Sequence, residues 1–175
     1  MPDILVRTIE AGDLPAVRDI YAHAVQNGLA SFELEAPDLD EMTRRHAAVT
    51  AAGYPYLVAV ADGRVLGYAY AGPYRARPAY RFTVENSIYV APDAHGRGVG
   101  RRLMAALIEA CEARGYRQMI AVIGDSANAA SIGLHSAFGF GRVGVLAGVG
   151  YKFGRWVDSV LMQRHLGPGS DAPPA

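Results

Sequence analysis

Apolar residues recur every three or four positions in two stretches of this chain, and that spacing predicts two helices that each bury one face. The first stretch begins after Asp13, whose carboxylate can cap a helix N-terminus, and ends at Gly28. The second begins at about residue 100 and ends at Gly115. In the second helix the apolar face includes Cys111, so this thiol is expected to be buried.

Two further helices are predicted from capping residues. Asp38 and Glu41 have the spacing of a capping box, which predicts a helix over 39–52 that stops at Gly53. Ser126 or Asn128 can cap a short helix over 129–137.

The segments between these helices have the two-residue alternation or the short apolar runs of strands. Asp62-Gly63 between two such segments is a strong hairpin signal. Strands are predicted over 4–9, 56–61, 64–71, 84–90, 118–123, 140–149 and 157–163. This order of elements predicts an α/β fold: a mixed central sheet of about six or seven strands with helices on both faces.

Composition and charge limit the possible functions. The 175 residues suit one domain, expected over 1–166, while the small and proline-rich residues 167–175 are expected to form a disordered tail. The formal net charge is +0, so there is no basic surplus for binding nucleic acid or a membrane surface. The single cysteine cannot form an internal disulfide, and no apolar run is long enough for a membrane span or a signal peptide. A cytoplasmic protein is expected.

The most informative stretch follows the strand 84–90, where three glycines alternate with other residues before a helix. Gly96, Gly98 and Gly100 can bring backbone N–H groups close to a ligand, and the helix N-terminus adds a positive dipole. Arg97 and Arg101 add positive charge. The stretch therefore favours a diphosphate, although a turn that simply needs glycines remains the plain alternative.

Two nucleotide-binding motifs fit this stretch poorly. A Walker loop requires Gly-Lys-Ser/Thr, which the chain lacks. A Rossmann fingerprint would need a glycine at the position of Arg101 and an acidic residue near the end of the next strand, which ends at Ile123-Gly124. The pyrophosphate loop of acetyl-CoA-dependent N-acetyltransferases fits best.

On these residues the sequence resembles the Gcn5-related N-acetyltransferase (GNAT) family over about residues 4–165. The family's phosphate motif, Gln/Arg-x-x-Gly-x-Gly/Ala, matches the segment from His95 to Gly100, with His95 departing from the usual first residue. A second family motif is matched by 128–140. The segments 84–90, 121–123, 131–135 and 150–158 resemble the phosphinothricin and methionine sulfone/sulfoximine acetyltransferases. These enzymes acetylate the α-amino group of small amino-acid analogues and are usually homodimers.

The resemblance implies where acetyl-CoA binds. In the family the fourth and fifth strands splay apart, commonly with a bulge in the fourth, and the acyl-pantetheine inserts between them. Asn128 is implied to bond the pantetheine amides, although a helix cap is the plain alternative. The implied acetyl-CoA residues are Ile88, Tyr89, Val90, His95, Gly96, Arg97, Gly98, Val99, Gly100, Arg101, Asn128 and Ser131.

Two residues are candidates for proton transfer. Glu85, on the central strand, can take the proton that an α-ammonium must lose before it attacks a thioester, directly or through water. Its plain alternative is a solvent-facing glutamate or one paired with a nearby arginine. His135 occupies the place where many family members have a tyrosine that protonates the departing thiolate, but a structural histidine fits equally well.

The acceptor is expected to be a zwitterion, because the subfamily acts on amino-acid analogues. Arg75, and less so Arg77, can bind its carboxylate. The implied substrate residues are Phe32, Arg75, Arg77, Glu85, Asn86 and Ser87. Four residues are candidates for shaping the pocket or a dimer contact: Tyr151, Lys152, Arg155 and Trp156. The lysine and the arginine alone are also typical of a solvated face.

The sequence thus favours direct acetyl transfer in a ternary complex without metal, and the resemblance implies a homodimer. His23, His46 and His165 lack metal-ligand spacing and are expected at the surface. A buried Cys111 argues against an acetyl-cysteine intermediate. A protein N-terminus, a polyamine or an aminoglycoside remains open as the acceptor, and so does a non-catalytic sensor of acyl-CoA.

Overall fold

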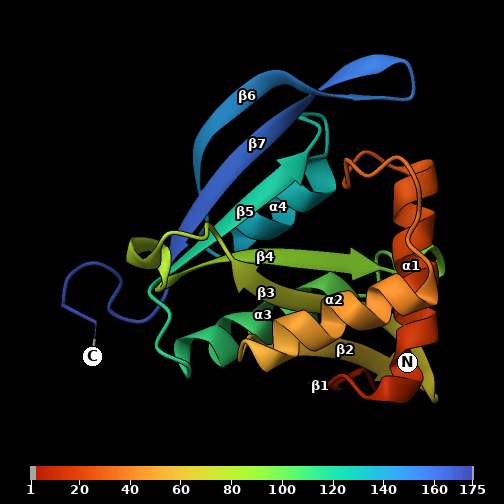
Figure 1. The fold of residues 1–175 in the computed structure, drawn as a ribbon, viewed down its shortest axis with the longest axis horizontal. Helices are drawn as coiled ribbons and strands as arrows, with labels where there is room; N and C mark the ends of the chain where they lie inside the picture. Colours follow the sequence, from red (N-terminus) through yellow and green to blue (C-terminus); the bar gives the residue numbers. More distant parts are fainter. Residues whose placement is uncertain (1–2, 175) are drawn as a thin grey trace.

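The computed structural model describes residues 3–174, and its centre is one seven-stranded sheet in the order β1-β2-β3-β4-β5-β7-β6 (Figure 1). β4 and β5 are parallel, and every other neighbouring pair is antiparallel. The strands are β1 (Leu5–Thr8), β2 (Tyr56–Ala61), β3 (Arg64–Pro73), β4 (Thr83–Val90), β5 (Gln118–Gly124), β6 (Gly141–Lys152) and β7 (Arg155–His165). The predicted mixed α/β sheet is confirmed.

Four α-helices cover the two faces of the sheet: α1 (Leu14–Asn27), α2 (Leu39–Ala51), α3 (Val99–Glu112) and α4 (Ala129–Ala137). α1 and α2 lie on one face, with α3 and α4 on the other (Figure 1). The α3 helix buries Leu103, Met104 and Leu107 completely against the sheet. Each such side chain stabilises the fold by about 1.5–3 kcal/mol. No helix within residues 3–174 is both long and apolar enough to cross a membrane.

The capping predictions were right at two helices and wrong at one. Asp38 accepts from the N–H of Glu41 (2.8 Å), and Asn128 accepts from the N–H of Ser131 (3.1 Å). Asp13 does not cap α1. Its carboxylate instead accepts from Nη1 of Arg7 (2.7 Å) and from the N–H of Glu10 (2.8 Å), because a short 3-10 helix, Ala11–Asp13, precedes α1.

β4 and β5 separate soon after they meet, as the family resemblance implied (Figure 1). They pair only from Thr83↔Gln118 to Glu85↔Ile120. On its other edge β4 stays in step with β3 from Pro73↔Val84 to Gly67↔Val90, without a register shift. The bulge expected in the fourth strand is therefore not present, and the splay comes from the diverging direction of β5.

The last two strands form a long hairpin that extends past the rest of the sheet (Figure 1). It is longer than predicted, since β6 continues to Lys152 and β7 begins at Arg155. After β7, residues 167–170 form turns and 171–172 a bend, and the Arg117 guanidinium donates to the carbonyl oxygens of Gly169 (3.3 Å) and Pro173 (3.0 Å). The disorder expected of this tail stays a prediction.

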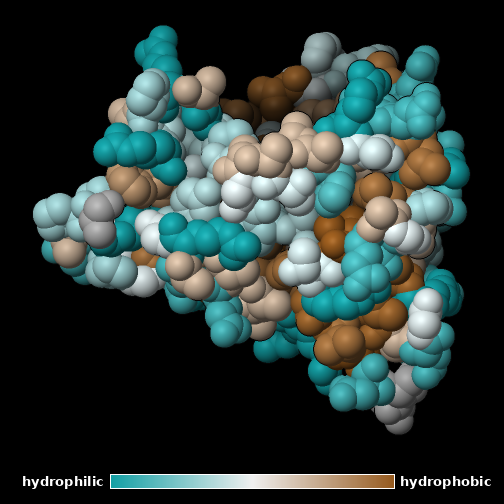
Figure 2. All heavy atoms as spheres, turned by 60° about the horizontal axis from the view of Figure 1, so that its bottom comes forward, coloured by the Kyte–Doolittle hydropathy of each residue, from teal (hydrophilic) through white to brown (hydrophobic). Residues whose placement is uncertain are grey.

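Both ends of the sheet expose apolar side chains. At the β1 edge of the sheet, Leu5 is exposed, and Figure 2 shows hydrophobic surface on the right, the side of β1 and the N-terminus. The β6–β7 hairpin carries seven of the twelve exposed large hydrophobic side chains in the described chain: Val143, Val145, Leu146, Val149, Tyr151, Phe153 and Trp156. The two places lie at opposite ends of the strand order.

Candidate active site

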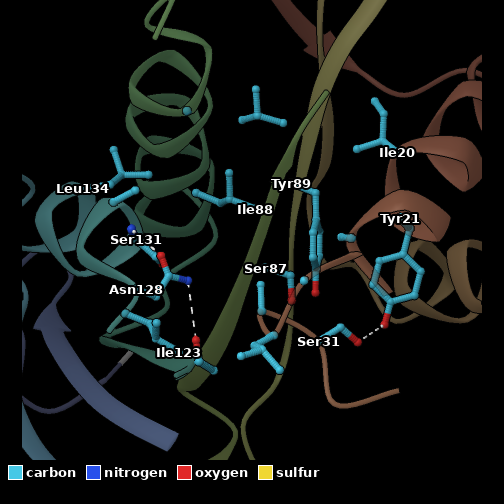
Figure 3. Close-up of a pocket in the computed structure, with 18 of the residues that line it drawn as sticks. Ile20, Tyr21, Ser31, Ser87, Ile88, Tyr89, Ile123, Asn128, Ser131 and Leu134 are labelled. Atoms are coloured by element: carbon cyan, nitrogen blue, oxygen red, sulfur yellow. Dashed lines mark hydrogen bonds between the residues drawn. The ribbon is translucent and has the colours of Figure 1, made fainter. Parts of the chain in front are cut away.

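A cavity of about 1210 Å³ opens where β4 and β5 diverge (Figure 3). Its walls come from α1, the segment between α1 and α2, both strands, the glycine loop and α4. Most residues selected from the sequence line it: Phe32, Glu85, Asn86, Ser87, Ile88, Tyr89, Val90, His95, Gly96, Gly98, Val99, Gly100, Arg101, Asn128, Ser131 and His135.

The glycine loop forms one end of the cavity. Gly96 (φ 74°) and Gly98 (φ 79°) have left-handed backbone conformations, which glycine adopts without strain. Gly98 directly precedes α3, and no side chain caps this helix, so its first N–H groups remain available to an anion. Arg101 lies beside them, its guanidinium over the ring of Phe138. This end of the cavity fits a diphosphate.

The free edge of β4 joins the two ends of the cavity. Beyond Glu85, no strand of the described chain pairs with the edge of β4 that faces β5. Its backbone groups from Asn86 to Val90 can therefore hold an extended chain such as pantetheine. One of them is occupied, because Nε2 of His95 lies 3.1 Å from the carbonyl oxygen of Val90. That contact ties the glycine loop to the strand.

Alternate residues of β4 face opposite sides of the sheet. In Figure 3, Ser87 and Tyr89 lie on the side of Tyr21 and Ser31, whereas Ile88 points toward Leu134 of α4. Glu85 belongs to the first set by alternation, and it is half-buried at the cavity wall. It makes no ion pair among the described residues, so the pairing with arginine that the sequence left open does not occur there. Burial raises the pKa of its carboxyl group.

On the opposite face, Asn86 and His135 form a buried pair. Nδ1 of His135 lies 2.8 Å from the carbonyl oxygen of Ser131, which can only accept, so Nδ1 carries the proton. Nε2 then accepts from the side-chain amide of Asn86 at 3.2 Å. Burial lowers the pKa of His135, and the bond to the Ser131 carbonyl opposes this in part. Both ring nitrogens of the neutral imidazole are thus engaged within the protein.

The other end of the cavity, which we call the acceptor end, is lined by Ser31, Phe32 and Glu85. Sequence reasoning missed Tyr21 and Ser31, whose hydroxyl groups lie 2.9 Å apart (Figure 3). No local pattern indicates this contact, because it forms only when the segment after α1 folds back over the helix.

Three predicted residues do not line the cavity: Arg75, Arg77 and Arg97. The Arg75 guanidinium lies over the rings of Tyr74 (5.1 Å) and Tyr80 (5.8 Å). Aromatic neighbours in its own loop therefore decide where this side chain points. Arg77 and Arg97 are exposed.

The three remaining histidines differ in their surroundings. His23 and His165 are exposed as expected, and His23 also borders the cavity. The surface prediction was wrong for His46, which is half-buried with its ring edge-on to Tyr56 (5.1 Å). Among residues 3–174 no three His, Cys, Asp or Glu side chains are grouped as metal ligands.

Comparison with known proteins agrees with this geometry. A family model described as "Acetyltransferase (GNAT) family" matches residues 16–140. The chain belongs to the GNAT acetyltransferase family. Membership confirms the fold and the class of N-acetyltransferase predicted from the sequence.

Three similar proteins cover nearly the whole chain. Phosphinothricin N-acetyltransferase of Alcaligenes faecalis is 58% identical over 97% of this chain and 86% of its own length. L-methionine sulfoximine/L-methionine sulfone acetyltransferase of Pseudomonas paraeruginosa is 44% identical, covering 96% and 98%. A crystal structure of a GNAT superfamily phosphinothricin acetyltransferase from Sinorhizobium meliloti, in complex with AcCoA, superposes with a TM-score of 0.95 at 46% identity, covering 98% and 93%.

Proposed function

We propose that this chain transfers the acetyl group of acetyl-CoA to the α-amino group of a small amino acid or analogue, such as phosphinothricin, methionine sulfone or methionine sulfoximine. The observation that carries the proposal is one continuous cavity with a diphosphate-binding loop at one end and Glu85 at the other. The free edge of β4 connects the two ends. The names of the two curated relatives support this class of acceptor.

The residues present fit acetyl-CoA, which supplies the activated acetyl group. The N–H groups at the start of α3 hold the diphosphate, and the backbone of residues 88–90 holds the pantetheine and orients the thioester. Glu85 accepts a proton from the α-ammonium, so that the amine attacks the thioester carbon. The carbon–sulfur bond breaks, and the second proton that the nitrogen loses on becoming an amide balances the one that the departing thiolate takes up.

Two side chains have supporting roles in this proposal. His135 and Asn86 position α4 against β4, since both ring nitrogens of His135 already have partners.

Cys111 takes no part as a nucleophile, because it is fully buried and burial raises the pKa of its thiol to about 12. Arg75 and Arg77 lie outside the cavity of one chain, so carboxylate binding by either residue stays a prediction.

We further propose that the protein is a cytoplasmic homodimer. The seven exposed apolar side chains on the β6–β7 hairpin support a second copy as the partner, because large apolar patches on a protein surface are typical of interaction sites. The single, buried thiol of Cys111 suits a reducing compartment.

The function is tested by following thiol release from acetyl-CoA with a panel of acceptors. The panel contains L-methionine sulfone, L-methionine sulfoximine, phosphinothricin, a polyamine, an aminoglycoside and a peptide with a free N-terminus. We expect release with the amino-acid analogues alone. Release only with the peptide, polyamine or aminoglycoside contradicts the proposed acceptor class. Tight binding of acetyl-CoA without release favours the sensor.

A further inference from the structure

The chain contains a single lysine, Lys152, among its seventeen basic residues, and this lysine is buried. Only 3% of its surface is exposed. Lysine side chains are almost never fully buried without a partner, because desolvating an ammonium group is costly. The alternative prediction from the sequence, that Lys152 lies on a solvated face, is therefore wrong. The burial of this ammonium group requires a structural explanation.

The partner of Lys152 lies in a distant part of the sequence. From the end of β6 its Nζ donates to the carbonyl oxygen of Ser31 at 2.8 Å. Ser31 belongs to the segment between α1 and α2, and its hydroxyl contacts Tyr21 of α1. A charge-assisted hydrogen bond therefore links the hairpin to the segment that forms the acceptor end of the cavity.

The same segment between α1 and α2 packs against two glycines of the sheet. A Cβ atom at Gly150 of β6 would lie 2.5 Å from the ring of Phe32. A Cβ atom at Gly124 of β5 would collide with the carbonyl oxygen of Leu29. Leu29 and Phe32 therefore fit only where the sheet has no side chain, and Lys152 binds Ser31, which lies between them in the sequence.

We propose that Lys152 is a positioning residue that holds residues 29–32 over the acceptor end of the cavity and thereby sets the affinity for the acceptor. The inference rests on the proposed function, because it assumes that the acceptor binds at this end. Lys152 does not itself line the cavity, so it acts through Ser31 and Phe32. The glycine loop is formed by other elements, so affinity for acetyl-CoA does not depend on Lys152.

The first test compares Lys152→Met with Arg142→Met, which removes an exposed cation from the same strand. We expect Lys152→Met to raise KM for L-methionine sulfone about ten-fold or more, as the loss of a charge-assisted hydrogen bond implies. In Lys152→Met, kcat and the Kd for acetyl-CoA should stay within about two-fold of wild type. In Arg142→Met, the KM for L-methionine sulfone, kcat and the Kd for acetyl-CoA should all stay within about two-fold. An unchanged KM, or equal losses of kcat and acetyl-CoA affinity, overturns the inference.

A second test uses the unaltered protein and does not depend on turnover or on the folding of a variant. Reductive methylation followed by mass spectrometry of the peptides separates Lys152 from the N-terminal amine, and any labelled lysine must be Lys152. We expect slow labelling that L-methionine sulfone at ten times its Kd slows about ten-fold more than the same concentration of D-methionine sulfone, whose amine consumes the reagent equally, since the acceptor binds the closed segment. Labelling that the bound acceptor leaves unchanged overturns the inference. Wild-type protein that acetylates none of the analogues instead defeats the proposed function.

Discussion

At the scale of a single residue, Glu85 shows how one side chain can favour activity and oppose stability. Burial raises the pKa of Glu85 in the folded chain. At pH values between the unfolded and the folded pKa, the folded chain therefore holds a proton that the unfolded chain has lost, and stability falls as pH rises. Catalysis needs the carboxylate, so kcat/KM should rise with pH through the raised pKa. Glu85→Gln should therefore lower kcat about 10²- to 10⁴-fold while leaving the protein at least as stable at neutral pH.

Steady-state kinetics and urea unfolding across a pH series check both parts of this expectation. Glu109→Gln is the matched control, since Glu109 is an exposed carboxylate on α3. It should leave the activity and its pH profile unchanged. A Glu85→Gln variant with wild-type kcat would assign the proton transfer to another group or to water alone.

The buried pair of His135 and Asn86 gives a second expectation at this scale. His135→Phe leaves the Asn86 amide without its imidazole acceptor, which should lower the free energy of unfolding by about 1–3 kcal/mol. Because the folded pKa of His135 is lowered, its stabilising contribution in the wild type is present above the unfolded pKa and is lost as pH falls through the folded value. Urea unfolding at several pH values checks both statements. A loss of kcat as large as that of Glu85→Gln would instead make His135 the proton donor to the thiolate.

At the scale of an element, the start of α3 depends on a glycine for its backbone conformation. Gly98 has φ 79°, and Gly115, just beyond the other end of α3, has φ 80°. A Cβ atom at either position meets nothing within 4 Å, so alanine there is strained but not crowded. Either substitution should cost about 1–2 kcal/mol of stability. Only Gly98→Ala should also weaken acetyl-CoA binding, by about ten-fold, as titration calorimetry can measure. Equal affinities of the two variants for acetyl-CoA would show that the glycine loop does not bind this ligand.

Elements were predictable where local chemistry determines them. The Asp62-Gly63 turn, the caps at Asp38 and Asn128 and the glycines before α3 all act within a few residues, and each was identified from the sequence. The site was less predictable where it depends on long-range packing. Nothing near Ser31 in the sequence indicates a bond to a lysine 121 positions away. The charge of Arg75 predicted a bond to the acceptor's carboxylate, but its guanidinium lies over the rings of Tyr74 and Tyr80 in its own loop.

At the scale of the whole molecule, the two ends of the sheet differ in how much apolar surface they leave uncovered. At the β6 end, Trp156 is 68% exposed and packs edge-on against Tyr151 (5.2 Å), among the other exposed apolar residues of the hairpin. At the β1 end, Leu5 is the exposed large hydrophobic side chain of its strand. A self-complementary interface buries several apolar side chains together, and the hairpin exposes seven large ones.

Trp156→Glu should therefore convert the proposed homodimer into a monomer of 18.6 kDa, because it places a charge among the exposed apolar side chains of the hairpin. Leu5→Glu introduces the same charge at the opposite end of the sheet and should leave the dimer intact. Light scattering coupled to size-exclusion chromatography, over a range of protein concentrations, distinguishes the two masses. If only Leu5→Glu dissociated the dimer, the interface would lie at the β1 edge and not at the hairpin. A wild-type monomer at every concentration would contradict the dimer itself, and the hairpin surface would then need another partner.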